Sequence, residues 1–195
     1  MTITATGTIS FSDLRTEFVG GGSAISFSDL YRGGSNVRKL AVDNTATNDA
    51  ASVPTAGTID MADFYGTAKS FTKTYSAGAT DQDASAIFGA DYSVSYPKNI
   101  VISSGVELGA SSTSQEALQI DSGGAGTITI TNDGTLSGAG GAVAGAGGDA
   151  FEANVTCTFI NNGTMRGGGG GGGAGGNGAY SQSQYFPDNQ GFWQV

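Results

Sequence analysis

The apolar positions in the first third of the chain repeat as a short unit. The hexamer ISFSDL occupies residues 9–14 and again residues 25–30, and a looser copy, IDMADF, occupies residues 59–64. Residues two positions apart share one face of a strand, and a Ser-Asp pair can cap a helix. The pattern therefore predicts a strand stub that leads into a short helical turn, three times over.

Units of this size cannot bury their apolar side chains alone. Gly20–Gly22 and Gly33–Gly34 end the first two copies, so we expect residues 1–66 to form one small module. Its apolar side chains either make a local core or anchor the module on a partner protein. The residues expected in this role are Ile9, Phe11, Leu14, Phe18, Ile25, Phe27, Leu30, Tyr31, Ile59, Met61 and Phe64.

The repeats carry a resemblance. Stretches such as Gly7-Thr8-Ile9-Ser10-Phe11-Ser12-Asp13-Leu14 and its second copy resemble segments of virion structural and tail proteins of bacterial viruses. The resemblance covers about residues 7–34. It implies a component of a phage particle, and the repeat module is expected to dock onto other virion proteins. The N-terminus lacks the basic start and apolar core of a secretory signal, which fits assembly in the host cytoplasm.

The middle of the chain has the periodicity of strands. Clean alternation over residues 70–75 and 92–96, and short apolar runs at 99–103, 118–121 and 126–132, predict strands. Residues 37–56 show no apolar periodicity and are predicted to be a polar connection. The predicted fold class is mainly β with little helix.

Two segments in the second half have the pattern of successive turns of one structure. Residues 127–138 and 156–167 each run from a strand through Asn-Asp-Gly or Asn-Asn-Gly to Thr, an apolar residue and Gly, with a weaker relative at 100–109. We expect the Asn/Asp-Gly pairs to supply positive-φ positions. Recurrence at a spacing of 29 residues favours a β-solenoid, with a β-sandwich as the alternative. The predicted division is 1–66, 67–122 and 123–195.

Glycine is concentrated in the last part of the chain. Of the 34 glycines, 21 lie within residues 123–178, and Gly167–Gly173 are consecutive. Such a run is either a flexible linker or a packed polyproline-II-type helix, which must hydrogen-bond to neighbouring chains. Glycine-rich stretches that follow small β turns resemble phage tail-fibre adhesins. That resemblance implies stacked glycine helices that present loops to the host.

The final segment changes character again. Residues 179–195 are aromatic, rich in amides and nearly uncharged. They either cap the stacked core, as any solenoid requires, or contact a host receptor or glycan, since rigid aromatics suit contact surfaces. The candidate contact residues are Tyr180, Tyr185, Phe186, Phe192 and Trp193.

Composition narrows the chemistry. A net charge of −9 disfavours nucleic acid as a partner, and no apolar run approaches the roughly 20 residues of a membrane helix. With no histidine and one cysteine, Cys157, the chain lacks the usual zinc ligands and an ordinary base for a nucleophile. We expect no cofactor, no metal and no catalytic residue. The carboxylate pairs Asp81/Asp83 and Asp149/Glu152 match no motif.

Together these features predict a non-enzymatic virion protein, from the tail, the tail tip or a tail fibre, that docks to the particle and contacts the host. A capsid decoration or head fibre is the alternative, and a glycan-cleaving spike is a third. A homo-oligomer is expected, with a trimer as the typical fibre symmetry.

Overall fold

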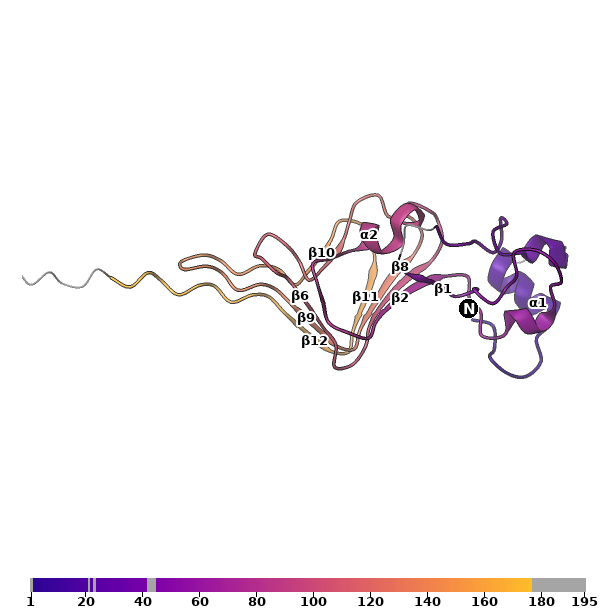
Figure 1. Ribbon diagram of the computed structural model, residues 1–195, viewed down its shortest axis with the longest axis horizontal. Coiled ribbons are helices and arrows are strands. Elements are labelled where there is room, and N and C mark those ends of the chain that lie inside the picture. Colours follow the sequence, from indigo (N-terminus) through magenta and orange to yellow (C-terminus); the bar gives the residue numbers. More distant parts are fainter. Residues whose placement is uncertain (1, 21, 23, 42–44, 177–195) are drawn as a thin grey trace, which may run out of the picture.

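The computed structural model describes residues 2–20, 22, 24–41 and 45–176. The molecule is elongated, with a small helical module at one end, a β body in the middle and long loops that project from the far side of the body (Figure 1).

The body is a β-solenoid of three turns with the start of a fourth. Each turn contributes one strand to each of three sheets. The strands are β2 (Phe71–Tyr75), β3 (Ala79–Thr80), β4 (Gln82–Asp83), β5 (Lys98–Ile102), β6 (Glu107–Gly109), β7 (Leu118–Ile120), β8 (Ile128–Asn132), β9 (Thr135–Ser137), β10 (Phe151–Ala153), β11 (Thr158–Asn161) and β12 (Thr164–Arg166).

The strands stack in parallel in the orders β2-β5-β8-β11, β3-β6-β9-β12 and β4-β7-β10. Among the described strands, β1 (Thr47–Asn48) alone pairs antiparallel, on the outer edge of β2. Thr135 pairs with Thr164 and Asn132 with Asn161, which keeps the predicted 29-residue offset. The mainly β class and the solenoid interpretation are confirmed, and the sandwich alternative is wrong.

Side chains fill the solenoid in columns, because parallel in-register pairing places each inward residue over its equivalent in the next turn. Ile100 lies against Ile130, and Leu108 against Leu136, and all four are fully buried. Helix α2 (Ala84–Phe88), followed by the 3-10 turn η4 (Gly89–Asp91), adds Ile87 and Phe88 to the same core.

The strand predicted over residues 92–96 is wrong. The segment is a series of turns after η4, in which Tyr92 N–H donates to the Gly89 carbonyl at 3.0 Å and Tyr96 N–H to the Val94 carbonyl at 2.7 Å. Both tyrosines are nevertheless buried. The alternation of tyrosine and polar residues reflects this burial. The backbone, however, forms hydrogen bonds within the segment and joins no sheet.

The Asn-Asp-Gly and Asn-Asn-Gly turns need glycine for a different reason from the one predicted. Neither Gly134 nor Gly163 has a positive φ. A Cβ at Gly134 would collide with the carbonyl oxygens of Val106 and Ser103 in the turn below, and one at Gly163 with the Gly134 carbonyl. The close stacking of turns therefore dictates glycine here.

The N-terminal module is held by its own core. Helix α1 (Phe11–Leu14) continues into the π-helical turn η1 (Arg15–Val19), and the other copies form the 3-10 turns η2 (Phe27–Leu30) and η3 (Met61–Phe64). The helical turns are confirmed. The extended residues before them join no described sheet, so the predicted strand stubs are wrong.

Residues 37–56 are more than the predicted polar connection. Val37, Ala50 and Val53 are fully buried in the core of the module, and Thr47 and Asn48 form β1. These three small apolar residues are isolated and follow neither a strand nor a helix period. The sequence pattern therefore gave no sign of their burial.

Candidate docking and contact surfaces

Each repeat copy closes its helical turn with the same hydrogen bond. The backbone N–H of the cap residue donates to the aspartate three positions later, from Ser10 to Asp13 at 2.7 Å and from Ser26 to Asp29 at 2.8 Å. In the third copy, Asp60 donates to Asp63 at 2.9 Å. The cap thus lies two residues before the predicted Ser-Asp pair.

These caps lower the pKa of two carboxylates. For Asp13, the hydrogen bonds from the Ser10 hydroxyl and N–H hold the pKa below its ordinary value, and for Asp29 those from Ser26 do the same. The repeat motif is therefore a capping box.

The apolar residues predicted to anchor the module divide by position. Leu14, Phe18, Leu30 and Phe64 are fully buried in the core of the module and stabilise it. The others remain at least partly accessible at its surface: Ile9, Phe11, Ile25, Phe27, Tyr31, Ile59 and Met61.

Two of the accessible rings meet at the surface of the module. Phe11 is 37% exposed and contacts Phe27 edge to face, with ring centroids 4.8 Å apart. Beside them is an open groove of about 270 Å³, lined by Phe11, Ser12, Arg15, Ala24 and Ile25. The lining of this groove is mainly apolar and includes the charged side chain of Arg15.

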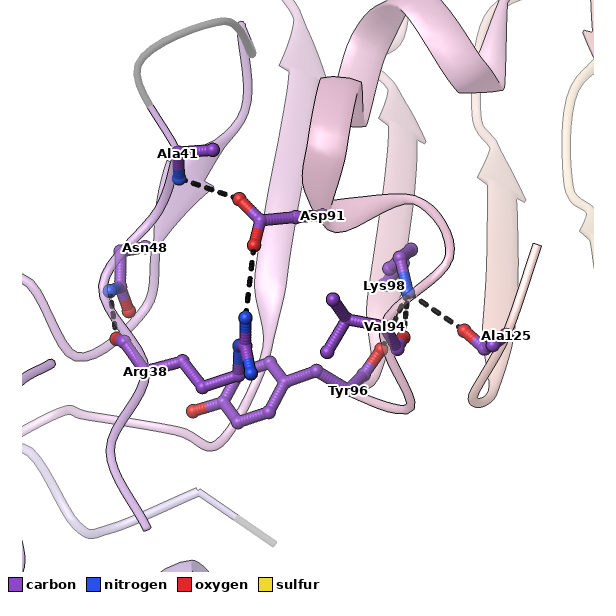
Figure 2. A network of polar contacts seen from close by, with 8 residues as sticks. All are labelled: Arg38, Ala41, Asn48, Asp91, Val94, Tyr96, Lys98 and Ala125. Atoms are coloured by element: carbon purple, nitrogen blue, oxygen red, sulfur yellow. Dashed lines mark hydrogen bonds and ion pairs between the residues drawn. The ribbon is translucent and has the colours of Figure 1, made fainter. Parts of the chain in front are cut away.

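The module is joined to the solenoid by polar contacts. Lys69 donates its backbone N–H to Glu17 at 2.7 Å and its ammonium to the Phe18 carbonyl at 2.8 Å. Asp91, buried beside the first turn, accepts the Ala41 N–H at 2.6 Å and lies 3.6 Å from the Arg38 guanidinium (Figure 2). These contacts orient the linking segment on the solenoid.

Lys98 is the most deeply buried charge of this network. It lies at the start of β5, is fully buried, and donates to the carbonyls of Val94 and Ala125 at 2.7 Å each and of Tyr96 at 3.0 Å (Figure 2). Desolvation by burial lowers the pKa of Lys98 to about 8, although the nearby Asp91 opposes this. The lysine ties together the loops that precede β5 and β8.

Glycine-rich segments form the longest projection from the body, which we call the glycine arm (residues 138–148 and 167–173). Its hydrogen bonds recur every three residues: Gly138, Gly141 and Ala144 donate to the carbonyls of residues 166, 169 and 172 at 2.8–2.9 Å. Gly168 and Gly171 donate to Gly148 and Gly145, both at 2.8 Å. Three residues per turn, with hydrogen bonds between neighbouring segments, is the packing of polyproline-II-type glycine helices. The flexible-linker alternative is therefore wrong for this run.

The arm distinguishes inward from outward glycines. A Cβ at Gly138, Gly141, Gly168 or Gly171 would collide with backbone atoms of a neighbouring chain, whereas one at Gly169 or Gly172 would meet no atom within 4 Å. Only glycine lets three backbones approach this closely.

The loops end in exposed tips. Val143 at the turn of the arm is 71% exposed, and the shorter loop between β6 and β7 exposes the hydroxyl residues 111–114. Both loops project from the same side of the body (Figure 1). The predicted aromatic contact residues, Tyr180, Tyr185, Phe186, Phe192 and Trp193, lie outside the described residues.

Three carboxylates of the acidic pairs noted in the sequence accept hydrogen bonds from other residues. Asp81 accepts the Ser111 N–H at 2.7 Å, Asp83 caps α2 through Ser85 N–H at 2.8 Å, and Glu152 accepts from Gln119 at 2.9 Å. The pair that does form, Asp83 with Asp121, joins successive turns. Sequence spacing could not reveal it without the register of β4 and β7.

Asp83 and Asp121 share the Ser85 N–H, which lies 3.0 Å from Asp121. Burial, followed by the hydrogen bond with Asp83, raises the pKa of Asp121. For Asp83, burial acts upward, but hydrogen bonds from Asp121 and Ser85 hold its pKa below the ordinary value. Among the described residues, no group of three or more acidic, histidine or cysteine side chains could hold a metal ion here.

Two other expectations concern single features. Cys157 is half-buried against the solenoid core with its thiol free, and burial raises its pKa. Within the described ranges, no helix is long and apolar enough to span a membrane.

A parallel β-solenoid that continues into packed glycine helices defines a fibre-like structural protein. The chain belongs to the phage tail fibre adhesin Gp38 family, whose sequence model matches residues 66–191. The match covers almost two thirds of the chain, namely the solenoid, the arm and most of the C-terminal segment. The repeats of residues 1–64 lie outside it.

Searches of curated proteins and of solved structures found no match to this chain.

Proposed function

We propose that this tail-fibre adhesin docks to the virion through residues 1–66 and meets the host with the opposite end of the molecule. The observation that carries the proposal is that the two ends of the molecule differ. The capped module lies at one end, and the loops project from the far side of the solenoid (Figure 1). Membership of the adhesin family supports the role of the projecting part, since the family match starts where the module ends.

The docking surface we propose is the accessible apolar side of the module. It consists of the Phe11–Phe27 pair and the groove that Ile25 and Arg15 help to line. A partly exposed aromatic pair beside a hollow is the kind of anchor on which binding energy is concentrated. The buried repeat residues hold this surface in shape.

The host-facing surface we propose consists of the loop tips, with Val143 and residues 111–114, together with the aromatic segment at 180–193. The arm holds its tip rigidly through backbone bonds, so contact there loses little conformational entropy. Binding, and not catalysis, is the proposed activity; release of sugar from host envelope polysaccharide by the purified protein would contradict it.

One experiment separates the two surfaces. Phe11→Asp is expected to abolish incorporation into particles, measured by complementing a phage that lacks this chain. Val143→Asp is expected to leave incorporation intact and to lower adsorption of the particles to host cells. Far-ultraviolet circular dichroism of each purified variant verifies folding. Normal incorporation of a folded Phe11→Asp chain would contradict the docking surface, and unchanged adsorption with Val143→Asp would contradict the role of the tip.

A further inference from the structure

The three copies of the repeat pack around one another in the N-terminal module. We number them copy 1 (residues 9–14), copy 2 (residues 25–30) and copy 3 (residues 59–64). At the surface, Phe11 of copy 1 contacts Phe27 of copy 2. The last residue of each copy is fully buried in one shared core, namely Leu14, Leu30 and Phe64. The copies therefore form a group whose members meet at boundaries.

A tyrosine closes two of the three boundaries between copies. Tyr31 directly follows copy 2, and its hydroxyl donates to the carbonyl of Gly57, two residues before copy 3. Tyr65 directly follows copy 3, and its hydroxyl donates to the carbonyl of Gly7, two residues before copy 1, at 2.6 Å. The links run from copy 2 to copy 3 and from copy 3 to copy 1, so they follow a ring.

The backbone repeats at the same two boundaries. Arg32 N–H donates to the Pro54 carbonyl at 3.0 Å, and Gly66 N–H to the Thr4 carbonyl at 3.1 Å. Each donor lies two residues after its copy, and each acceptor lies five residues before the next one. Residues that are distant in the sequence thus build the same boundary twice, in a pseudo-threefold arrangement of the copies.

The third boundary, between copies 1 and 2, has an arginine where the others have tyrosine. Arg15 directly follows copy 1. Its φ of −61° matches those of Tyr31 and Tyr65, −59° and −60°. Since φ fixes where Cβ lies relative to the preceding residues, the three side chains leave their turns in a similar direction. The ψ angles differ, −44° against 135° and 129°, because the chain after Arg15 continues as η1.

The open groove of the module lies at this third boundary. Copy 1 and the residue after it contribute Phe11, Ser12 and Arg15 to its lining, and Ala24 and Ile25 form the wall on the side of copy 2. The groove, of about 270 Å³, therefore corresponds to the place that a tyrosine ring takes at the other two boundaries. Arg15 supplies no ring here.

Arg15 also leaves a polar group beside this groove unsatisfied. Its Nε is shielded from solvent and has no hydrogen-bond acceptor among the described residues. An unpaired buried donor costs free energy, so an incoming group that brings an acceptor is favoured. The guanidinium carries a positive charge and a flat face, and both suit the electron-rich face of an aromatic ring.

We propose that the groove between copies 1 and 2 receives a tyrosine side chain from the virion protein on which the module docks. This partner chemistry rests on the docking surface proposed above, which it makes specific. The tyrosine ring packs between Phe11 and Ile25 beside the Arg15 guanidinium, and the incoming segment supplies the acceptor that Nε lacks. A side chain of the partner thus completes the third boundary, as Tyr31 and Tyr65 complete the other two.

An acidic side chain is a rival occupant, since a carboxylate would pair with Arg15. The tyrosine is favoured because Phe11, Ala24 and Ile25 give the groove mainly apolar walls, against which a carboxylate would lose its hydration. A second copy of this chain is the other rival. The virion partner is favoured over it because the groove adjoins the Phe11–Phe27 pair of the proposed docking surface.

Arg15→Tyr fills the groove from within the chain. Because the same residue type already closes the other two boundaries, we expect this variant to fold with an unchanged or raised melting temperature. Its incorporation into particles, measured by complementing a phage that lacks this chain, should fall about tenfold or more. Lys39→Tyr places the same ring at an exposed lysine of the linking segment. It is the matched control and should incorporate normally.

Comparison with Phe11→Asp separates the tyrosine proposal from the docking surface itself. If Phe11→Asp abolishes incorporation and folded Arg15→Tyr incorporates normally, the tyrosine proposal is wrong and the docking surface stands. If both variants incorporate normally, both proposals are wrong. A wild-type dimer in analytical ultracentrifugation that Arg15→Tyr converts to a monomer would overturn the virion partner in favour of a second copy.

A small-molecule titration of the full-length chain tests the groove without any particle, whether or not Arg15→Tyr folds. N-acetyltyrosinamide should shift the NMR signals of the Ala24 and Ile25 amides of the wild type in a saturable way. The amides of N-acetylleucine and N-acetylaspartate should bind about tenfold more weakly. Equal or tighter binding of either one, or no saturable shift with N-acetyltyrosinamide, would overturn the proposal.

Discussion

The solenoid and the glycine arm keep the same 29-residue register by opposite means. In the solenoid, columns of Ile, Leu and Phe fix which residues lie over each other, and a one-residue slip would turn them outward. In the arm, the absence of side chains lets three backbones bond directly at every third residue. Any shift by three would preserve those bonds, so the arm takes its register from the strands at its base.

The difference teaches where each region is vulnerable. Large side chains must be kept in the solenoid and excluded from the inward positions of the arm and from the Asn-x-Gly turns. Five predictions sharpen this contrast.

Gly134→Ala is expected to have the largest effect. Its new Cβ would collide with the Val106 and Ser103 carbonyls of the turn below, and overpacking against rigid backbone should lower the free energy of unfolding by about 3 kcal/mol. Gly109→Ala, where a Cβ meets no atom within 4 Å, is the control. Urea denaturation compares the two; equal midpoints would show that the turns are not closely stacked.

Lys98→Met should destabilise the protein by about 3 kcal/mol, since it leaves one buried and two partly buried carbonyls without their donor. The control is Lys39→Met, at an exposed lysine of the linking segment. If the melting temperature falls no further for Lys98→Met than for Lys39→Met, the stabilising role assigned to the Lys98 ammonium is wrong.

The same lysine makes stability depend on pH. Its pKa in the folded protein is about 8, below the ordinary 10.5, so between these values the unfolded chain binds more protons and the free energy of unfolding rises with pH. Relative to Lys98→Met, the wild type should gain about 2 kcal/mol from pH 7.5 to 9.5. Denaturation of both proteins across this range tests the sign, and a constant difference would refute it.

Gly171→Ala is expected to act locally. Its Cβ would meet the Ala142 carbonyl and separate the chains of the arm, while the solenoid keeps its columns. Hydrogen exchange at the amides of Ala144 and Gly171 should quicken about tenfold, which corresponds to about 1.4 kcal/mol of local stability. Gly169→Ala, on the open side, should leave exchange unchanged, and a shifted global midpoint for Gly171→Ala would contradict the separation of arm and body.

Arg166→Ala should change least. Arg166 contacts Glu107 at 2.9 Å and Ser137 at 2.9 Å, but the pair is largely exposed, and surface ion pairs contribute little. The unfolding midpoint should stay unchanged. The pKa of Glu107, which hydrogen bonds from Ser137 and Arg166 hold below its ordinary value, should rise when measured by NMR; no rise would mean that the contact is absent in solution.

Local patterns predicted much of the body. Alternating residues at 71–75 and 128–132 specify strands because one face is buried, and the 29-residue recurrence indicates stacking because equivalent positions repeat the same residue types. The repeat units predicted helical turns, since Leu14, Leu30 and Phe64 occupy equivalent places. These features can be read from the pattern of residue types alone.

The rest depends on contacts between distant segments. Lys98 is an ordinary strand residue until the Val94 and Ala125 carbonyls converge on it, and Asp121 becomes the partner of Asp83 only once β4 lies beside β7. Gly134 was assigned to the right turn for the wrong reason, because a neighbouring turn, not its own φ, requires glycine.

The connections between the second and third strands of each turn differ in length, although the strands they join stay in register. One residue links β3 to β4, residues 110–117 link β6 to β7, and residues 138–150 link β9 to β10. The parallel ladder thus keeps the same register whatever the length of the loop that joins its strands. Selection can lengthen, shorten or change the sequence of such a loop while the strands beneath it keep theirs. The loop surface is therefore free to diversify faster than the solenoid.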